Sequence, residues 1–344
     1  MLNIQTFLEK YYNKDEKVIL ACSAGPDSMF LLYKILETNF RKNVVVCYFN
    51  HGTRPETDLE EKFLEELGKK EGFQVEVASC DFEKIQKLYP SKSFEELARE
   101  KRYQFFDAVL DIYKTDKVLL GHHLDDKIET FFFNLARGTK LTGLINMQEC
   151  SSPSPQGEVR GGLVSGGGSG VLRPLLELEK TNILKYLDDN KLKYFIDSSN
   201  SENTYTRNKL RNTIIPKFGE VNSSYKKNIK NTINYFEQVK EFIDSEVKIF
   251  LEEQGILIFN SGKYKINTLS INGYFYIEDF NKKTDLLQKE IISHIFHISN
   301  GGSTIGLSEA NIGDIIKFIN GKNNKTIKEI KELKMRKENT IIIY

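Results

Sequence analysis

Residues 17–28 read KVILACSAGPDS, and this stretch decides how the first half of the chain folds. Its apolar run is typical of a strand buried on both faces, and a helical pattern begins at Ser28. The connecting residues, called here the SAGPDS turn, are Ser23, Ala24, Gly25, Pro26, Asp27 and Ser28. Backbone N–H groups at the start of a helix bind phosphate, so the turn is a candidate phosphate site. Taken alone, it fits an ordinary connecting turn equally well, since neither GxxxxGK[ST] nor GxGxxG is present.

The alternation of strand and helix continues to about residue 136. Short apolar runs predict strands at residues 17–22, 44–49, 73–78 and 117–121. Apolar spacings of three and four predict helices at residues 28–38, 57–71, 93–113 and 125–136. Strand and helix repeated in this way predict an α/β fold with a doubly wound parallel sheet, Rossmann-like in outline. Such folds bind ligands beyond the carboxyl ends of their strands.

Length and composition exclude several classes of protein. With 344 residues, of which 40% are hydrophobic and 28% charged, the chain is neither a single small module nor disordered. No run approaches the roughly 18 apolar residues of a membrane helix, and the first twelve residues are already amphipathic. We therefore expect a cytoplasmic protein with no targeting segment and no membrane partner. The absence of any CxxC pair excludes a zinc site or disulfide framework built on Cys22, Cys47, Cys80 and Cys150.

Charge is unevenly distributed along the chain. Residues 1–150 hold 21 Lys and Arg against 25 Asp and Glu, whereas residues 151–344 hold 28 against 23. The most basic window, residues 205–230, has a net charge of +6, with only Glu220 opposing its basic side chains. Such a window attracts a phosphate backbone, although a solvated helix face explains it equally well.

Polar side chains follow two of the predicted strands. The strand that ends at Gly121 continues into HHLDD, which places Asp125 and Asp126 where the sheet presents its ligands. Carboxylate oxygens suit a Mg²⁺ ion bound to nucleotide phosphates, although paired acids are also ordinary at the start of a helix. The second strand runs into His51, and a lone histidine is more often structural than functional.

Several segments together carry a family resemblance. SAGPDS resembles the SGGxDS loop of the PP-loop ATP pyrophosphatases, which split ATP into AMP and pyrophosphate while they adenylate a substrate. The match narrows to the tRNA(Ile)-lysidine synthetase family on the segments NHGTR, SFEELAREKRY, GHHLDDKIET, RPLL, DSSNSEN and YTRNKLRNTIIP. These segments occur in the family's order over residues 17–216.

The resemblance implies an activity. Enzymes of this family use ATP to adenylate the C2 oxygen of cytidine 34 in a tRNA(Ile) with anticodon CAU. Free L-lysine then displaces AMP, which forms lysidine. ATP and Mg²⁺ are therefore the expected cofactors, tRNA(Ile) and L-lysine the expected partners, and the resemblance allows for a homodimer.

The resemblance also implies roles for particular residues. ATP binding is assigned to Ser23, Ala24, Gly25, Pro26, Asp27, Ser28, His51 and Gly121. Asp27 and Asp126 are the candidate metal ligands, and catalysis is assigned to Asp125, Asp126, Arg102 and Arg207. Contact with tRNA is assigned to Arg207, Asn208, Arg211, Lys226, Lys227 and Lys230. Either Asp125 or Asp126 is expected to take a proton from the attacking lysine amine, which is mostly protonated at neutral pH.

We expect two domains. Residues 1–216 form the PP-loop catalytic domain, with a flexible Ser/Pro/Gly-rich insert at 150–171. Residues 217–344 form a mostly helical tRNA-binding domain that ends in short strands, with helices expected at 223–255 and 284–319. The additional C-terminal domain of longer family members is expected to be absent.

One residue departs from the family loop. Ala24 stands where the second glycine of SGGxDS is usual, which strains the backbone if this position needs a positive φ. Two alternatives stay open. A tRNA thiolase of the same superfamily needs reactive or cluster-binding cysteines, and a non-catalytic RNA- or nucleotide-binding module would bind ATP without releasing pyrophosphate.

Overall fold

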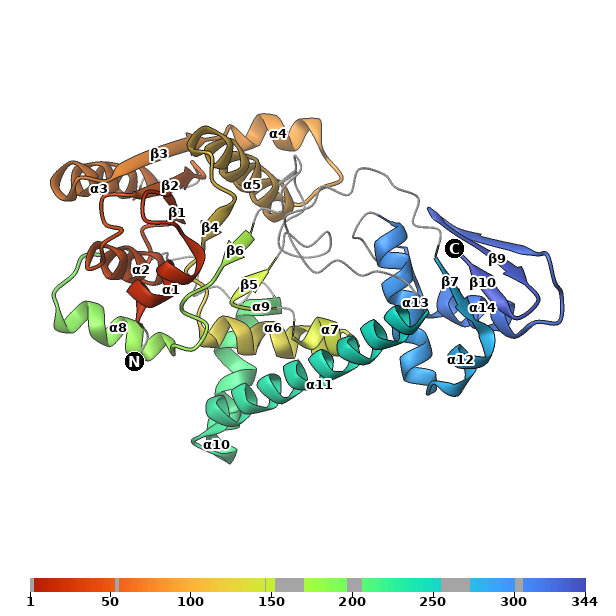
Figure 1. Ribbon diagram of the computed structural model, residues 1–344. Helices are drawn as coiled ribbons and strands as arrows, with labels where there is room; N and C mark the ends of the chain where they lie inside the picture. The colour runs from red at the N-terminus through yellow and green to blue at the C-terminus, as the bar shows by residue number, and fades with distance from the viewer. Residues whose placement is uncertain are drawn as a thin grey trace. The chain divides into compact units, whose positions relative to one another are not determined.

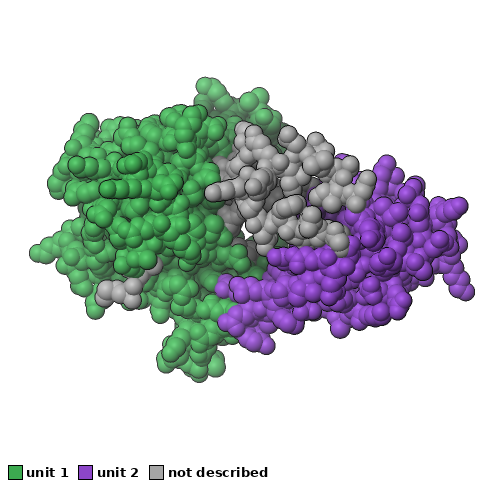
Figure 2. Space-filling view, viewed as in Figure 1, with its two compact units in different colours: residues 1–234 green, residues 235–344 purple. Residues whose placement is uncertain are grey.

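A computed structural model describes residues 3–52, 56–145, 147–151, 170–196, 206–254, 273–300 and 306–344. The chain divides into two compact units, Met1–Asn234 and Tyr235–Tyr344 (Figure 2). Assignment of the catalytic and tRNA-binding domains to residues 1–216 and 217–344 stays a prediction. No helix in the described ranges has both the length and the apolar character needed to cross a membrane.

The first unit is built on a sheet with strand order β3-β2-β1-β4-β6-β5. Its strands are β1 (Val18–Ala21), β2 (Val44–Asn50), β3 (Gln74–Ser79), β4 (Lys117–Leu119), β5 (Cys150–Ser151) and β6 (Gly170–Leu172). All neighbouring pairs are parallel except β5 with β6. Strands β2 and β3 extend the sheet to one side of β1, and β4 lies on the other. The topological switch point, where such sheets bind ligands, therefore lies between β1 and β4.

Helices cover both faces of this sheet, with α2 and α8 on one side and α5 on the other (Figure 1). Side chains alternate along β1, because Leu20 packs toward α2 and α8 whereas Ile19 packs toward α5. The helices are α1 (Ile4–Tyr11), α2 (Pro26–Leu36), α3 (Glu56–Glu71), α4 (Phe82–Leu88), α5 (Phe94–Tyr113), α6 (Leu124–Ala136), α7 (Leu141–Leu144), α8 (Lys180–Asp189), α9 (Thr206–Lys209), α10 (Phe218–Val221) and α11 (Tyr225–Glu253). Between α9 and α10 lie a π-helix, η2 (Leu210–Ile214), and a 3₁₀ turn, η3 (Ile215–Lys217). The predicted doubly wound α/β fold is confirmed.

The predicted flexible insert, residues 150–171, needs a correction at its ends. Cys150 and Ser151 form β5, while Gly170 and Val171 belong to β6, so these positions are strand rather than loop. Strand β6 pairs with β4, whose backbone donors and acceptors would otherwise be unpaired at that edge. The rest of the insert, residues 152–169, lies outside the described residues.

The second unit combines helices with a small antiparallel sheet. Beyond the end of α11, its helices are α12 (Ile277–Lys282), α13 (Asp285–Ser299) and α14 (Glu309–Asn320). The sheet has strand order β7-β10-β9-β8, formed by β7 (Tyr274–Tyr276), β8 (Ile327–Ile330), β9 (Leu333–Glu338) and β10 (Ile341–Ile343). Phe250 of α11 packs against Phe275 and Phe280, with ring centroids 6.0 and 6.5 Å apart.

Candidate active site

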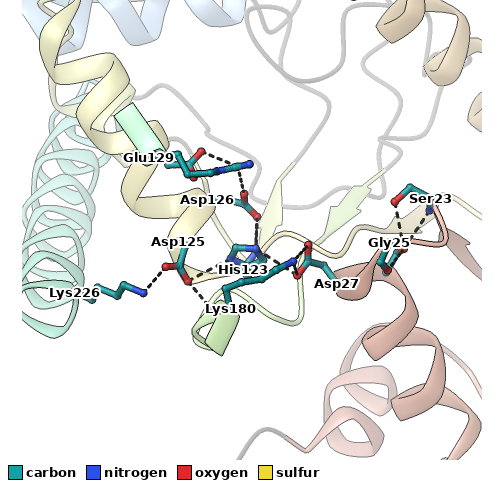
Figure 3. A network of polar contacts seen from close by, with 11 residues as sticks. Ser23, Gly25, Asp27, His123, Asp125, Asp126, Glu129, Lys180 and Lys226 are labelled. Carbon is teal, nitrogen blue, oxygen red and sulfur yellow. Dashed lines mark hydrogen bonds and ion pairs between the residues drawn. The ribbon is translucent and has the colours of Figure 1, made fainter. Parts of the chain in front are cut away.

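The SAGPDS turn is held closed by its own serine (Figure 3). Ser28 Oγ accepts a hydrogen bond from the backbone N–H of Ser23 at 3.2 Å and donates one to the Gly25 carbonyl at 3.1 Å. Pro26 is the first residue of α2, where a missing N–H costs nothing. Ala24 is buried and has a φ of 56°. The backbone at this position therefore has the positive φ that the sequence analysis named as a source of strain. Alanine adopts this left-handed region only at an energetic cost.

Two elements meet at the start of α2. The N–H groups of Asp27 and Ser28 lie in the first turn of the helix, so neither has a carbonyl partner within it. Gly121, just after β4, approaches this turn so closely that an added Cβ would lie 3.1 Å from both Asp27 C and Ser28 N. A side chain at position 121 would force the two elements apart. Free N–H groups at a helix start therefore lie beside the end of β4, a geometry suited to phosphate.

Two predicted metal ligands meet at one imidazole. His123, at the start of α6, has Nε2 3.5 Å from Asp27 Oδ1 and 3.5 Å from Asp126 Oδ2. The Asp126 carboxylate is held in position by its own helix start, because it also accepts a hydrogen bond of 3.0 Å from the backbone N–H of His123. The carboxyl ends of β1 and β4 thus bring Asp27 and Asp126 together across the switch point. With Asp125 and Glu129 of α6, they form what we call the acidic cluster.

Later segments supply cations to this cluster (Figure 3). Lys180, the first residue of α8, places Nζ 2.6 Å from each carboxylate oxygen of Asp27. Its backbone N–H donates to Asp125 Oδ2 at 2.8 Å. Lys226 of α11 lies with Nζ 2.6 Å from Asp125 Oδ1. Two carboxylates from the first 130 residues are therefore paired with lysines that come much later in the chain.

Two arginines lie against α6. Arg211 forms a two-point ion pair with Glu129, and its Nη2 lies 3.4 Å from Asp126 Oδ1. The guanidinium carbon of Arg207 lies 5.2 Å from the centroid of the Phe133 ring. Arg207 and Arg211 thus face positions four apart on α6.

Burial and ion pairing together shift the pKa values of two carboxylates in opposite directions. Burial alone would raise the pKa of Asp125, but hydrogen bonds from Lys226 and from the Lys180 N–H outweigh it and lower that pKa. For Glu129, burial is the stronger effect, so its pKa is raised although Arg211 opposes the shift. Asp125 is consequently a poor proton acceptor at neutral pH.

Two predicted residues lie apart from these contacts. Arg102 lies on α5, 5.9 Å from the centroid of the Tyr103 ring, and burial lowers the pKa of its guanidinium. Within the described ranges, no hydrogen bond or ion pair joins Arg102 to the acidic cluster. His51 follows β2, and its ring lies 5.0 Å from the Phe49 ring and 5.8 Å from the Phe82 ring. The assigned roles of Arg102 and His51 stay predictions.

The predicted tRNA-binding lysines differ in their surroundings. Lys226 is held by Asp125, and Lys230 pairs with Glu177, so both face the first unit's own carboxylates. Lys227 is exposed, and no ion pair involves it in the part of the chain that the structure describes. Asn208 follows Arg207 on α9 and is half-buried. Of the seven basic side chains in the window, Arg211, Lys226 and Lys230 are thus paired with carboxylates, and no ion pair between described residues involves any of the other four.

Sequence reasoning gave no role to Lys180, His123 or Glu129. Glu129 lies three residues after Asp126 on one helix, a spacing that could have indicated a shared face. Lys180 is separated from Asp27 by 153 residues, and no local pattern reveals that contact. Arg173 likewise received no role from the sequence, although its side chain is only 1% exposed and donates a hydrogen bond of 3.1 Å to His122 Nδ1.

The residues present fit ATP and Mg²⁺. Asp27 and Asp126 supply hard oxygen donors beside a helix start that can receive phosphate. No group of three or more His, Cys, Asp or Glu side chains is arranged for a metal ion among the described residues. A Mg²⁺ ion here would therefore complete its coordination with phosphate oxygens and water, as Mg²⁺ commonly does with nucleotides.

Comparison with known proteins gives the family. A family model described as a PP-loop domain matches residues 1–218. The chain belongs to the PP-loop domain family. It is also similar to the tRNA(Ile)-lysidine synthase of Borreliella afzelii, at 29% identity over 318 residues that cover 83% of this chain and 68% of that protein. The same enzyme of Bacteroides thetaiotaomicron is 30% identical over 255 residues, which cover 73% of this chain and 55% of that one.

These comparisons confirm the family resemblance that the motifs indicated. This PP-loop protein spans between about half and two thirds of the length of the two relatives. Among solved structures, the U34-tRNA thiolase NcsA from Methanococcus maripaludis is similar in fold, with a TM-score of 0.52 and 15% identity. That match covers 70% of this chain and 77% of the thiolase chain.

Proposed function

We propose that this protein ligates lysine to C2 of cytidine 34 in a tRNA(Ile) with anticodon CAU, at the expense of ATP. The observation that carries the proposal is the convergence of Asp27 and Asp126 at His123, directly beside the SAGPDS turn. Carboxylates next to a phosphate-binding helix start are what ATP cleavage requires. The named relatives supply the substrate class.

In the first step, the C2 oxygen of cytidine attacks the α-phosphorus of ATP, and pyrophosphate leaves. A ring oxygen is a poor leaving group, and its adenylation makes the later departure feasible. The N–H groups of Asp27 and Ser28 would hold phosphate, and Asp27 and Asp126 would hold Mg²⁺. When bound, Mg²⁺ neutralises negative charge that grows on pyrophosphate.

In the second step, the lysine amine attacks C2, and the bond from C2 to the adenylated oxygen breaks so that AMP leaves. The amine must first lose a proton, because little of it is neutral at pH 7 when its pKa is about 10.4. Of the two candidate bases, Asp125 is disfavoured, because Lys226 and the Lys180 N–H lower its pKa. We therefore give Asp125 a positioning role at the start of α8, and Asp126 stays the remaining candidate base for the step after pyrophosphate has left.

A direct assay tests the proposal. Purified protein is incubated with tRNA(Ile) bearing CAU, ATP, Mg²⁺ and labelled lysine, and the digested tRNA is analysed for lysine-modified cytidine. Asp27→Asn and Asp126→Asn should each abolish pyrophosphate release while circular dichroism stays unchanged. Arg207→Ala should slow product formation even at saturating tRNA. Full activity in both aspartate variants would remove these residues from the mechanism.

The same assay separates the alternatives. A nucleotide sensor would bind ATP without tRNA-dependent pyrophosphate release. A thiolase would need a reactive thiol, yet Cys22 and Cys47 are buried and burial raises the pKa of the Cys22 thiol. Labelled product in a variant with all four cysteines replaced by serine or alanine would exclude thiolase chemistry.

Two further expectations belong to this proposal. A cytoplasmic location follows from the tRNA substrate, and fractionation of cells would test it. The family resemblance allows for a homodimer, and sedimentation equilibrium of the purified protein would measure the assembly.

A further inference from the structure

Lys180 makes a close contact in the site that no motif predicted. Its Nζ lies 2.6 Å from both oxygens of Asp27, and each of the two side chains is 29% exposed. We propose that Lys180 takes the place of a metal ion on Asp27 before nucleotide binds, and passes to the ATP phosphates when Mg²⁺ arrives. This inference rests on the proposed function and adds a phosphate-binding residue to it.

A metal ion that binds Asp27 must disturb the ion pair between Lys180 and Asp27. A carboxylate with both oxygens on one ammonium group cannot also present them freely to Mg²⁺. Two cations sharing Asp27 would repel each other at short range. Lys180 must therefore move away, or give up at least one oxygen, when a metal ion binds there.

The backbone of Lys180 is fixed although its side chain can move. Its backbone N–H donates a hydrogen bond of 2.8 Å to Asp125 Oδ2, and Lys180 is the first residue of α8. The four-carbon side chain beyond this anchor is flexible, and its ammonium group has three donors. Because Asp27 is itself in the first turn of α2, an ammonium that leaves its carboxylate is already beside the phosphate-binding N–H groups. An arriving polyphosphate offers it a new negative partner.

The alternative is that the pair only holds α8 against α2. A purely structural pair would stabilise the fold, but its loss would not change affinity for nucleotide and metal in opposite directions. The proposed exchange predicts such an opposition. Without Lys180, Asp27 is open to a metal ion, whereas the phosphates have lost a cation.

Two binding measurements on the full chain test the exchange. The first is calorimetry with α,β-methylene-ATP and Mg²⁺, an analogue that cannot be cleaved between its α and β phosphorus atoms. Lys180→Met should weaken this binding by at least about tenfold, the usual scale for a charge-assisted hydrogen bond. The second is titration with Mn²⁺ alone, followed by electron paramagnetic resonance. There Lys180→Met should bind Mn²⁺ about tenfold more tightly than the wild type.

Matched variants define the controls. Lys185→Met changes an exposed lysine on the same helix and should leave both affinities unchanged. Lys180→Arg keeps the cation and should stay within about threefold of the wild type in both measurements. Unchanged analogue binding or unchanged Mn²⁺ binding in Lys180→Met would overturn the exchange. A wild type that binds no analogue would instead refute the proposed function, and the Mn²⁺ titration would still decide whether Lys180 covers Asp27.

If Lys180→Met does not fold, the variants Asp27→Asn and Asp126→Asn test the exchange instead. Asp27→Asn frees Lys180, so ATP in the presence of EDTA should bind about tenfold more tightly than to the wild type. Asp126→Asn removes the same charge nearby but keeps the pair of Lys180 with Asp27, so its gain should be clearly smaller. Equal gains in the two variants would show that only net charge matters, and the exchange would be wrong.

Discussion

The carbonyl oxygen of Ala24 accepts a hydrogen bond of 2.9 Å from the backbone N–H of Phe195. The segment that contains α8 therefore contacts the SAGPDS turn at two points, since Lys180 also binds Asp27. Both contacts depend on the conformation of the turn. A change at Ala24 should thus affect both the candidate nucleotide site and the segment that contains α8 and Phe195.

Ala24→Gly should be nearly neutral for stability and should keep or raise activity. Glycine relieves the strain of the left-handed backbone conformation, which is about 1–2 kcal/mol. The variant also loses a buried methyl group, and its unfolded chain has more conformational entropy, so both of these effects oppose the gain. We expect a net change under about 1 kcal/mol by urea unfolding. Ala24→Val should lose more than about 2 kcal/mol, because a β-branched residue tolerates a φ of 56° poorly. A fully active Ala24→Val variant would contradict this account.

Gly121→Ala should weaken ATP binding and destabilise the first unit by about 1–3 kcal/mol. The new methyl group would lie 3.1 Å from backbone atoms of Asp27 and Ser28, which cannot move without opening the turn. Gly313→Ala is the matched control, since an added Cβ there meets nothing within 4 Å. Inside α14, that change should slightly stabilise the protein. Nucleotide titration and thermal unfolding of both variants would measure the difference.

Lys226→Met should destabilise the protein most at neutral pH. The pKa of Asp125 is lowered in the folded chain and that of Lys226 is raised. A lowered carboxyl pKa gives stability that is present above its unfolded value and lost as pH falls through the folded value. A raised lysine pKa gives stability that is lost only as pH rises through the folded value. The variant's deficit should therefore be largest between about pH 5 and pH 9 and shrink below about pH 3.

Asp107→Asn should stabilise the protein at neutral and alkaline pH. Burial, with a smaller contribution from Asp111, raises the pKa of Asp107 to about 7, and its Oδ1 is buried without a hydrogen-bond partner among the described residues. The folded chain thus holds a proton that the unfolded chain releases near about pH 4. Wild-type stability should fall as pH rises from about 4 to 7, and the variant should lack this fall. Partial exposure screens the effect to on the order of 1 kcal/mol. Identical pH profiles would show that Asp107 is solvated.

Lys227→Ala should weaken all tRNAs about equally. Lys227 is exposed, so a phosphate contact there should contribute up to about one unit to the slope of log affinity against log salt. Lys230→Ala should change the slope less, because Lys230 is paired with Glu177 and releases no counterion from RNA while that pair persists. Filter binding over a salt series would compare the two. If the slope of log affinity against log salt is the same in both variants and in the wild type, the basic window is a solvated surface that does not contact tRNA phosphates.

The positions of Asp27 and Asp126 could be predicted from local patterns, because strand and helix boundaries in the sequence place them. Asp27 and Asp126 each lie in the first turn of a helix that follows a buried strand, and the strand order then brings both to one edge. The partners of these carboxylates could not be predicted in the same way. Lys180 and Arg211 reach them through tertiary packing, across gaps of 153 and 85 residues.

Two strands inside the sheets, β6 and β9, were hardest to predict. Strand β6 has three residues beside a glycine-rich stretch, so it offers little periodicity. In β9 the inward positions are Leu333, Met335 and Lys337, and the charged third member conceals the alternation. Lys337 is buried because its ammonium donates to the carbonyls of Ile319 and Gly321 at the end of α14.

The order in which the acidic cluster and its cations appear along the chain has a consequence for protein synthesis. All four carboxylates have been made by Glu129, whereas Lys180, Arg211 and Lys226 follow later. At roughly 5–20 residues per second, the ribosome needs several seconds to add the ~50 residues between Glu129 and Lys180. During that interval the carboxylates of the acidic cluster lack these three cationic partners, and their negative charge would repel RNA. An unfinished or truncated chain would therefore not sequester tRNA, and the site becomes able to accept its polyanionic ligands only when the cationic segments have been added.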